Sequence, residues 1–184
     1  MRVITGTAKG RKLFSFGGKT VGEGRRPTSD FIKQAIFSRI QFDIEGRRVL
    51  DLFAGTGQLG IETLSRGAVI ADFVDTDTAT VEKNIAATGF ADRANVIKSD
   101  ALTFLKRVSG RYDLIFLDPP YRSDLLDKVL REITAIDILN IGGIIVCESQ
   151  RGALDCVEYS GYVKREYGYS EKTITLYTRV EVDE

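Results

Sequence analysis

The chain of 184 residues contains no histidine, and this absence is the most restrictive feature of its composition. It excludes an imidazole general base, a Ser-His-Asp triad and most zinc sites. The two cysteines, Cys147 and Cys156, are too few for a disulfide framework and lack metal-binding spacing, so we expect plain thiols. No apolar run reaches the roughly 18 residues of a membrane span. The first residues also lack the apolar core of a signal peptide, which favours a cytoplasmic location without a membrane partner.

Neither charge sign dominates, because 26 Lys and Arg residues balance 26 Asp and Glu residues. The balance conceals an asymmetry, since residues 1–48 hold 11 basic residues against 4 acidic ones. A basic end on an acidic body indicates contact with a polyanion, although a solvated face is the plainer alternative. The candidates for phosphate contacts are Arg2, Lys9, Arg11, Lys12, Arg25 and Arg26.

The order of elements predicts an α/β fold. Two short β-runs, Val3–Thr5 and Lys12–Phe16, are followed by a glycine-rich loop and a helix that Thr28 or Ser29 can cap. From residue 48 onward, apolar runs of strand length alternate with helical stretches, which predicts a parallel sheet covered on both faces. The last two runs alternate polar and apolar residues and predict an antiparallel hairpin at one edge of the sheet.

The stretch DLFAGTGQLGIETL, residues 51–64, contains Gly55, Gly57 and Gly60 in the spacing G-x-G-x-x-G. After a strand, such a turn lets the backbone approach a nucleotide, and the following helix offers free N–H groups. Asp75 lies 20 residues beyond Gly55, where a carboxylate accepts hydrogen bonds from a ribose. Up to this point, NAD and S-adenosylmethionine fit equally well.

Asp51 separates the two cofactors. It precedes the glycine loop, where a carboxylate repels a pyrophosphate but attracts the ammonium and sulfonium of S-adenosylmethionine. Asp100, followed by Ala101, adds a carboxylate at the end of the third strand run, where it can accept from an adenine amino group. Asp75 and Asp100 could alternatively cap the helices that follow them. Acidic residues at the ends of three successive strands favour S-adenosylmethionine, the cationic ligand, over NAD.

The second motif is YDLIFLDPPY, an apolar strand that runs into Asp118-Pro119-Pro120-Tyr121. The prolines stiffen the backbone and remove two donors, which leaves a turn of hydrogen-bond acceptors. An exocyclic amine is a poor nucleophile because its lone pair is delocalised into the base ring. Acceptance of its two hydrogens by Asp118 and a Pro119 carbonyl frees that lone pair for in-line attack on the sulfonium methyl and stabilises the developing positive charge. Tyr121 offers a stacking face for the base.

Together the two motifs resemble those of amino-methyltransferases that use S-adenosylmethionine. A closer resemblance covers nearly the whole chain and is carried by RVITGTAKGRKL, RRPTSDFIKQAIFSRI, LDLFAGTGQLGIETLSRGA and FLDPPY. These segments are similar to those of the RsmD-type family, bacterial methyltransferases that modify the exocyclic N2 amine of a guanine in 16S ribosomal RNA. The resemblance implies a seven-stranded, Rossmann-like class I methyltransferase sheet of order 3-2-1-4-5-7-6 with an antiparallel last hairpin.

The resemblance also implies the division of the chain and its site. Residues 1–27 are expected to form a basic β-hairpin extension that contacts RNA, and residues 28–184 the methyltransferase domain. The expected partner is 16S rRNA within the small ribosomal subunit or an assembly intermediate, with no obligate protein partner. The expected catalytic residues are Asp118, Pro119, Pro120 and Tyr121, and the expected cofactor residues are Asp51, Gly55, Gly57, Asp75, Asp100 and Ala101. Asp77 could share the ribose contact, because the family more often has a longer glutamate at the position of Asp75.

Two rival functions remain open at this point. A DNA adenine N6-methyltransferase would use the same D-P-P-Y chemistry, but no separate target-recognition region is visible in the chain. A non-catalytic ribosome-assembly factor would use the fold only to bind RNA, and the intact glycine loop and Asp118 argue against it. An NAD oxidoreductase explains neither Asp51 nor the acceptor turn.

Overall fold

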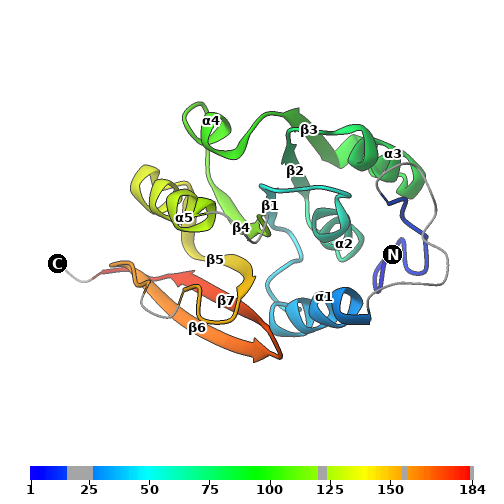
Figure 1. Ribbon diagram of the computed structural model, residues 1–184. Helices are drawn as coiled ribbons and strands as arrows, with labels where there is room; N and C mark the ends of the chain where they lie inside the picture. The colour runs from blue at the N-terminus through cyan, green and yellow to red at the C-terminus, as the bar shows by residue number, and fades with distance from the viewer. Residues whose placement is uncertain (16–26, 120–123, 155–156, 183–184) are drawn as a thin grey trace.

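A computed structural model describes residues 1–15, 27–119, 124–154 and 157–182 (Figure 1). Its strands are β1 (Arg48–Asp51), β2 (Ile70–Asp75), β3 (Ala94–Lys98), β4 (Tyr112–Leu117), β5 (Leu139–Gln150), β6 (Tyr162–Tyr169) and β7 (Lys172–Arg179). They form one sheet in the order β3-β2-β1-β4-β5-β7-β6. The first five are parallel, whereas β7 runs antiparallel to both β5 and β6. The predicted topology is therefore confirmed.

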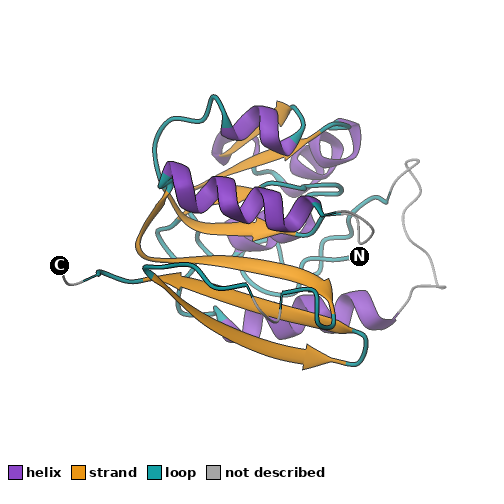
Figure 2. Ribbon diagram, turned by 60° about the vertical axis from the view of Figure 1, so that its left-hand side comes forward, coloured by secondary structure: helices purple, strands orange, loops and turns teal. Residues whose placement is uncertain are grey.

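The helices are α1 (Pro27–Arg39), α2 (Gln58–Ser65), α3 (Ala79–Thr88), α4 (Ala101–Leu105) and α5 (Leu125–Ile136), with a short 3-10 turn at Ala91–Arg93. They lie on both sides of the sheet (Figure 2). Buried apolar residues of α1, α2 and α3 share one core cluster with one sheet face, and those of α4 and α5 share a second cluster with the other face. Among the described residues, none of the helices combines the length and the apolar composition that a membrane span requires.

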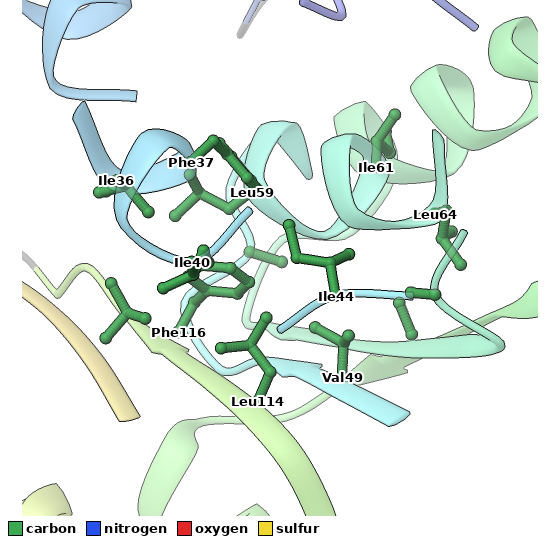
Figure 3. Packing of buried hydrophobic residues seen from close by; sticks show 14 of the residues in the cluster. Ile36, Phe37, Ile40, Ile44, Val49, Leu59, Ile61, Leu64, Leu114 and Phe116 are labelled. Carbon is green, nitrogen blue, oxygen red and sulfur yellow. The ribbon is translucent and has the colours of Figure 1, made fainter. Parts of the chain in front are cut away.

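The first of these clusters explains why α1 packs where it does. Its apolar residues recur at helical spacing, so that Ile36, Phe37 and Ile40 form one buried stripe. The stripe contacts α2 and the strands, and Phe37 lies with its ring centroid 6.0 Å from that of Phe116 in β4 (Figure 3). The helix begins at Pro27, so the predicted caps Thr28 and Ser29 lie inside it and that expectation was wrong. Proline is favoured in the first helical turn, where its missing N–H is not needed.

The N-terminal segment, residues 1–15, is less regular than predicted. Instead of two β-strands it has an isolated antiparallel bridge between Arg2 and Lys12, and its described residues form no strand. Val3 and Leu13 are buried in the first core cluster, so the segment packs on the body of the protein. The predicted division at residue 27 stays a prediction, because residues 16–26 lie outside the described ranges.

A buried carboxylate on α2 holds this segment in place. Glu62 is fully buried and accepts the backbone N–H groups of Ile4 and Thr5 at 2.8 and 3.0 Å. The same carboxylate pairs with Lys33 of α1 at 3.0 Å and with Arg66 at 2.9 Å. A buried charge is tolerated only when it is paired and hydrogen-bonded, and Glu62 meets both conditions. The segment is therefore attached to the helix that begins at the glycine loop.

Two glycines of the segment provide a matched test of this attachment. Gly6 and Gly10 both have positive φ angles, but a methyl group on Gly6 would overlap the carbonyl oxygen of Ser65, whereas one on Gly10 would meet nothing. Each change to alanine should cost about 1–2 kcal/mol for the left-handed backbone. Only Gly6→Ala should also displace the segment and accelerate hydrogen exchange at Thr7 and Ala8, whose N–H groups bond to Ser65. Equal exchange rates in the two variants would contradict this account.

Candidate active site

The site lies at the carboxyl ends of the central parallel strands. Asp51, the last residue of β1, is in register with Phe73 of β2 and Phe116 of β4. The chain after β1 stays close to both neighbours, because the N–H of Leu52 bonds to Phe116 and that of Ala54 to Val74. Strand order reverses at β1, and in open α/β sheets ligands bind in the crevice at such a point.

Three glycines shape the turn between β1 and α2. Gly55 and Gly57 have φ angles of +54° and +75°, in the left-handed region that favours glycine. Gly60 lies in the first turns of α2, and a Cβ atom there would overlap the ring of Phe73 in β2. The first two glycines therefore permit the turn, and the third permits close packing of the helix on the sheet, as the motif requires.

Asp51 is buried at the centre of this arrangement. Its side-chain oxygen accepts the N–H of Gly60 at 3.0 Å, and only 3% of the residue is exposed. Burial raises its pKa to about 7, the Gly60 hydrogen bond opposes that shift, and the charge of Asp75 adds to it. The crevice thus holds a carboxyl group whose charge is poorly compensated, which favours a cationic ligand.

Asp75 stabilises the glycine loop directly. One carboxylate oxygen accepts the N–H of Gly55 at 2.8 Å, and the other accepts the N–H of Asp77 at 3.1 Å. Asp77 is exposed and accepts the N–H of Ala79 at 3.2 Å, which stabilises the turn into α3. Both carboxylates therefore stabilise the backbone around the loop and the turn that follows β2.

Asp100 has the capping role that the sequence left as an alternative. It precedes α4, and its carboxylate accepts the N–H of Thr103 at 2.9 Å. The bonds to Thr103 also hold its pKa below the ordinary value. Ala101, the first residue of α4, is buried. The neighbouring Ser99 N–H bonds to the carbonyl of Asp75, which places the end of β3 beside the end of β2.

Asp118 follows β4 directly. Because β1 lies between β2 and β4, Asp118 and Asp75 lie on opposite sides of Asp51. Its pKa is raised to about 7, mainly by burial, next by the charge of Glu148 and less by that of Asp51, while Lys172 acts in the opposite direction. Pro119 is buried, whereas Pro120 and Tyr121 lie outside the described residues. The structure therefore brings the described part of the D-P-P-Y motif next to the glycine loop, as the two motifs predict.

The predicted RNA-contact residues lie on the surface of the N-terminal segment. Arg2, Lys9, Arg11 and Lys12 are exposed, and Arg25 and Arg26 fall outside the described ranges. Arg11 donates to the carbonyl of Ala87 at the end of α3, at 2.9 Å. Lys83 of α3 lies 3.9 Å from the ring centroid of Phe14, so the basic surface extends onto that helix.

Sequence reasoning missed four residues that support the site. Asn84 of α3 is fully buried, donates to the carbonyls of Thr56 and Phe14, and accepts the N–H of Phe14. It thereby joins the glycine loop to the N-terminal segment. The others are Glu62, Glu148 and Lys172. A polar residue at a buried helix position, such as Asn84, was the available signal, but its partners lie too far along the chain to identify from spacing.

Cys147 is a buried free thiol of β5 whose pKa is raised by burial, and Cys156 lies outside the described residues. Across the described ranges, no group of three or more Cys, Asp or Glu side chains is arranged to hold a metal ion.

The strand order, the antiparallel last hairpin and the position of the glycine loop define a class I methyltransferase fold. The chain belongs to the family described as Conserved hypothetical protein 95, the RsmD family, whose model matches residues 1–178. YlbH of Bacillus subtilis is 42% identical over 158 residues, with 82% of this chain and 83% of that protein covered. Ribosomal RNA small subunit methyltransferase D of Escherichia coli is 32% identical over 182 residues, covering 97% and 90%. The solved structure of Escherichia coli yhhF has a TM-score of 0.83 and 31% identity, with 98% of each chain covered.

The raised pKa of Asp51 predicts how Asp51→Asn changes stability with pH. Because the pKa is about 7 in the folded protein and about 3.8 in the unfolded chain, the unfolded state loses its proton first and wild-type stability falls between these values. An amide keeps an oxygen for Gly60 but carries no charge. Relative to wild type, the variant should gain little near pH 4 and on the order of 4 kcal/mol above pH 7.

Urea unfolding at pH 4, 6 and 8 measures this difference, with Asp92→Asn as the control at an exposed position. The control should follow wild type at every pH. A variant that is less stable than wild type at pH 8 would show that the Asp51 carboxylate is not held at an energetic cost.

Proposed function

We propose that the protein transfers a methyl group from S-adenosylmethionine to the exocyclic N2 amine of a guanine in 16S ribosomal RNA. The observation that carries this proposal is the position of Asp118 and Pro119 beside the glycine loop, at the end of β4. Membership of the family and the name of the Escherichia coli relative support rRNA methylation. The choice of guanine N2 rests on the acceptor chemistry of the motif and on the resemblance.

The crevice fits the charge of this cofactor. S-adenosylmethionine carries an ammonium and a sulfonium and supplies an activated methyl group. Asp51 and Asp118 both have raised pKa values, and the charge of Asp51 contributes to the shift of Asp118. A bound cation would favour their ionised forms, so cofactor binding and carboxylate ionisation stabilise each other. The residues that would hold the cofactor are Asp51, Gly55, Gly57, Asp75, Asp100 and Ala101, with Asp77 able to share the ribose.

The reaction requires an acceptor for the N–H groups of the attacking amine. Ionised Asp118 accepts one of them, and the carbonyl of Pro119 accepts the other. As the nitrogen–carbon bond forms and the sulfur–carbon bond breaks, positive charge develops on the nitrogen, where these oxygens stabilise it. The nitrogen then loses a proton, and a carboxylate whose pKa lies near 7 can take it at neutral pH. No histidine is needed.

The N-terminal segment supplies the surface that binds RNA. Its exposed basic residues, continued by Lys83 on α3, face solvent as a group held by Glu62 and Asn84. Phosphate contacts of this kind position a substrate without reading its sequence. A protein of this size has little surface for base reading, so we propose that the target is recognised by shape within the small ribosomal subunit or an assembly intermediate.

Asp118→Ala separates an enzyme from a protein that only binds RNA. The variant should bind S-adenosylmethionine with affinity close to wild type and lose at least about 100-fold in methyl transfer, because it lacks the main acceptor for the amine. Asp124→Ala changes an exposed carboxylate six residues further on and should keep wild-type activity. Calorimetric cofactor binding and transfer of labelled methyl to small subunits measure the two effects. Normal transfer by Asp118→Ala would refute the mechanism.

Charge reversal tests the RNA surface. Replacement of Lys9 and Lys12 by glutamate should weaken binding to 16S RNA by about tenfold or more and reduce the steepness of its salt dependence, because fewer counterions are released. The same change at Lys106 and Arg107, exposed at the end of α4, should have a small effect. Filter binding from 50 to 300 mM salt measures both. A flat salt response in the wild-type protein would exclude phosphate contacts.

A further inference from the structure

Three polar side chains form a staggered row across the sheet beyond the cofactor residues. Lys172 is in register with Gln150, two residues beyond Glu148, and its side chain reaches back to Glu148. Asp118 follows β4, Glu148 lies in β5 and Lys172 begins β7, and these strands are consecutive neighbours in the sheet. Leu117 is in register with Cys147, so the residues that follow them, Asp118 and Glu148, stand side by side. Adjacent strands are about 4.8 Å apart, which is the spacing expected between these two backbones.

All three side chains belong to the face of the sheet on which α1 and α2 pack. Leu117 and Cys147 belong to the core cluster of α4 and α5, and alternation along a strand turns Asp118 and Glu148 to the opposite face. Lys172 shares that face with Ile174, two residues further along β7, which belongs to the other cluster.

The electrostatics of the site support this proximity. The charge of Glu148 raises the pKa of Asp118, and the charge of Lys172 lowers it. Glu148 and Lys172 also form an ion pair across β5 and β7. The Glu148 side chain is 10% exposed and that of Lys172 is 25% exposed, so the pair lies largely out of water yet is partly accessible. A pair in this environment costs desolvation energy, which makes a purely stabilising role a weak explanation.

We propose that Asp118, Glu148 and Lys172 read the Watson–Crick edge of the target guanine, a proposal that rests on the function proposed above. Across the strands the row presents an acceptor, an acceptor and a donor. Guanine presents the complementary order along one edge: the N2 amine as donor, N1–H as donor and O6 as acceptor. Enzymes that act on an extruded base commonly recognise it by hydrogen bonds to this edge.

The same row disfavours other bases. Adenine has an acceptor at N1 and a donor at C6, so it would face Glu148 and Lys172 with the wrong polarity at both positions. The ion pair between Glu148 and Lys172 does not prevent either side chain from contacting the base. An ammonium has three N–H donors and a carboxylate has about four acceptor positions, so each can bond to its partner and to guanine. A site that hydrogen-bonds its substrate rejects an analogue lacking those groups by as much as 10⁴-fold or more.

The test uses 2,6-diaminopurine, which keeps the N2 amine but reverses the polarity at N1 and C6. Small subunits are assembled from 16S RNA that carries either guanine or this analogue at the position methylated by the wild-type protein. We expect wild type to prefer guanine by at least about 100-fold in kcat/KM. Glu148→Gln should reduce that preference by at least about tenfold, because an amide N–H can donate to N1 of the analogue.

Glu166→Gln is the matched control, because Glu166 also pairs with a lysine of the same hairpin, Lys164, at 3.1 Å. Glu148 is in register with Ile174 of β7, whereas Glu166 is in register with the next residue, Thr175. Successive residues of a strand point to opposite faces, so Glu166 belongs to the other face of the sheet. The control should keep the wild-type preference. The double variant Glu148→Gln, Lys172→Gln keeps a neutral hydrogen-bonding pair across the strands and should lose the preference as well.

The outcomes distinguish the two proposals. Equal losses of activity on both bases, with unchanged preference and unchanged cofactor affinity, would overturn base reading by the pair. If Glu148→Gln fails to bind S-adenosylmethionine, the base preference of the double variant is measured instead. An unchanged preference in that variant would likewise overturn base reading by the pair. If the wild-type protein labels no guanine at N2, the proposed function itself fails, and this inference fails with it.

Discussion

The arrangement of the site depends on carboxyl groups gathered at the carboxyl ends of adjacent strands. Asp51 is almost completely buried, and its carboxylate accepts a hydrogen bond from the N–H of Gly60. Asp75 and Asp118 lie on either side of it. The charge of Asp75 raises the pKa of Asp51, and the charge of Asp51 raises the pKa of Asp118. A crevice with this excess of negative charge is matched by a cation, which explains how a dinucleotide-like glycine loop suits a sulfonium nucleoside better than a pyrophosphate.

The same crevice is mechanically connected to the surface proposed to bind RNA. Asn84 bonds to Thr56 in the glycine loop and to Phe14 in the N-terminal segment, while Glu62 in α2 bonds to the backbone of Ile4 and Thr5. The segment is therefore not an independent arm in the described residues. Its basic side chains are presented from a surface fixed relative to the reacting groups, and a positioned phosphate backbone would place a base at a defined distance from Asp118.

The sequence predicted most of the fold because each element carries a strong local signal. Apolar runs identified the first five strands, polar–apolar alternation identified the last two, and the glycine spacing identified the turn at Gly55 and Gly57. The sequence predicted the N-terminal segment poorly, because its pairing depends on Glu62 and Ser65, which lie about 60 residues away in the chain. The helix caps at Thr28 and Ser29 were wrong because Pro27 itself begins the helix. For the site, strand ends predicted Asp51, Asp75, Asp100 and Asp118, whereas Glu148 and Lys172 became visible only through the register of β5 with its neighbours.

We propose that this acidic group of residues directs an activated methyl group to the N2 amine of guanine in 16S RNA. Incubation of the wild-type protein with methyl-labelled S-adenosylmethionine, small ribosomal subunits, free 16S RNA and duplex DNA, followed by digestion to nucleosides, tests it most directly. We expect the label to be recovered as N2-methylguanosine from the ribosomal RNA. Recovery of the label in N6-methyladenine from DNA, or in no nucleoside at all, would contradict it.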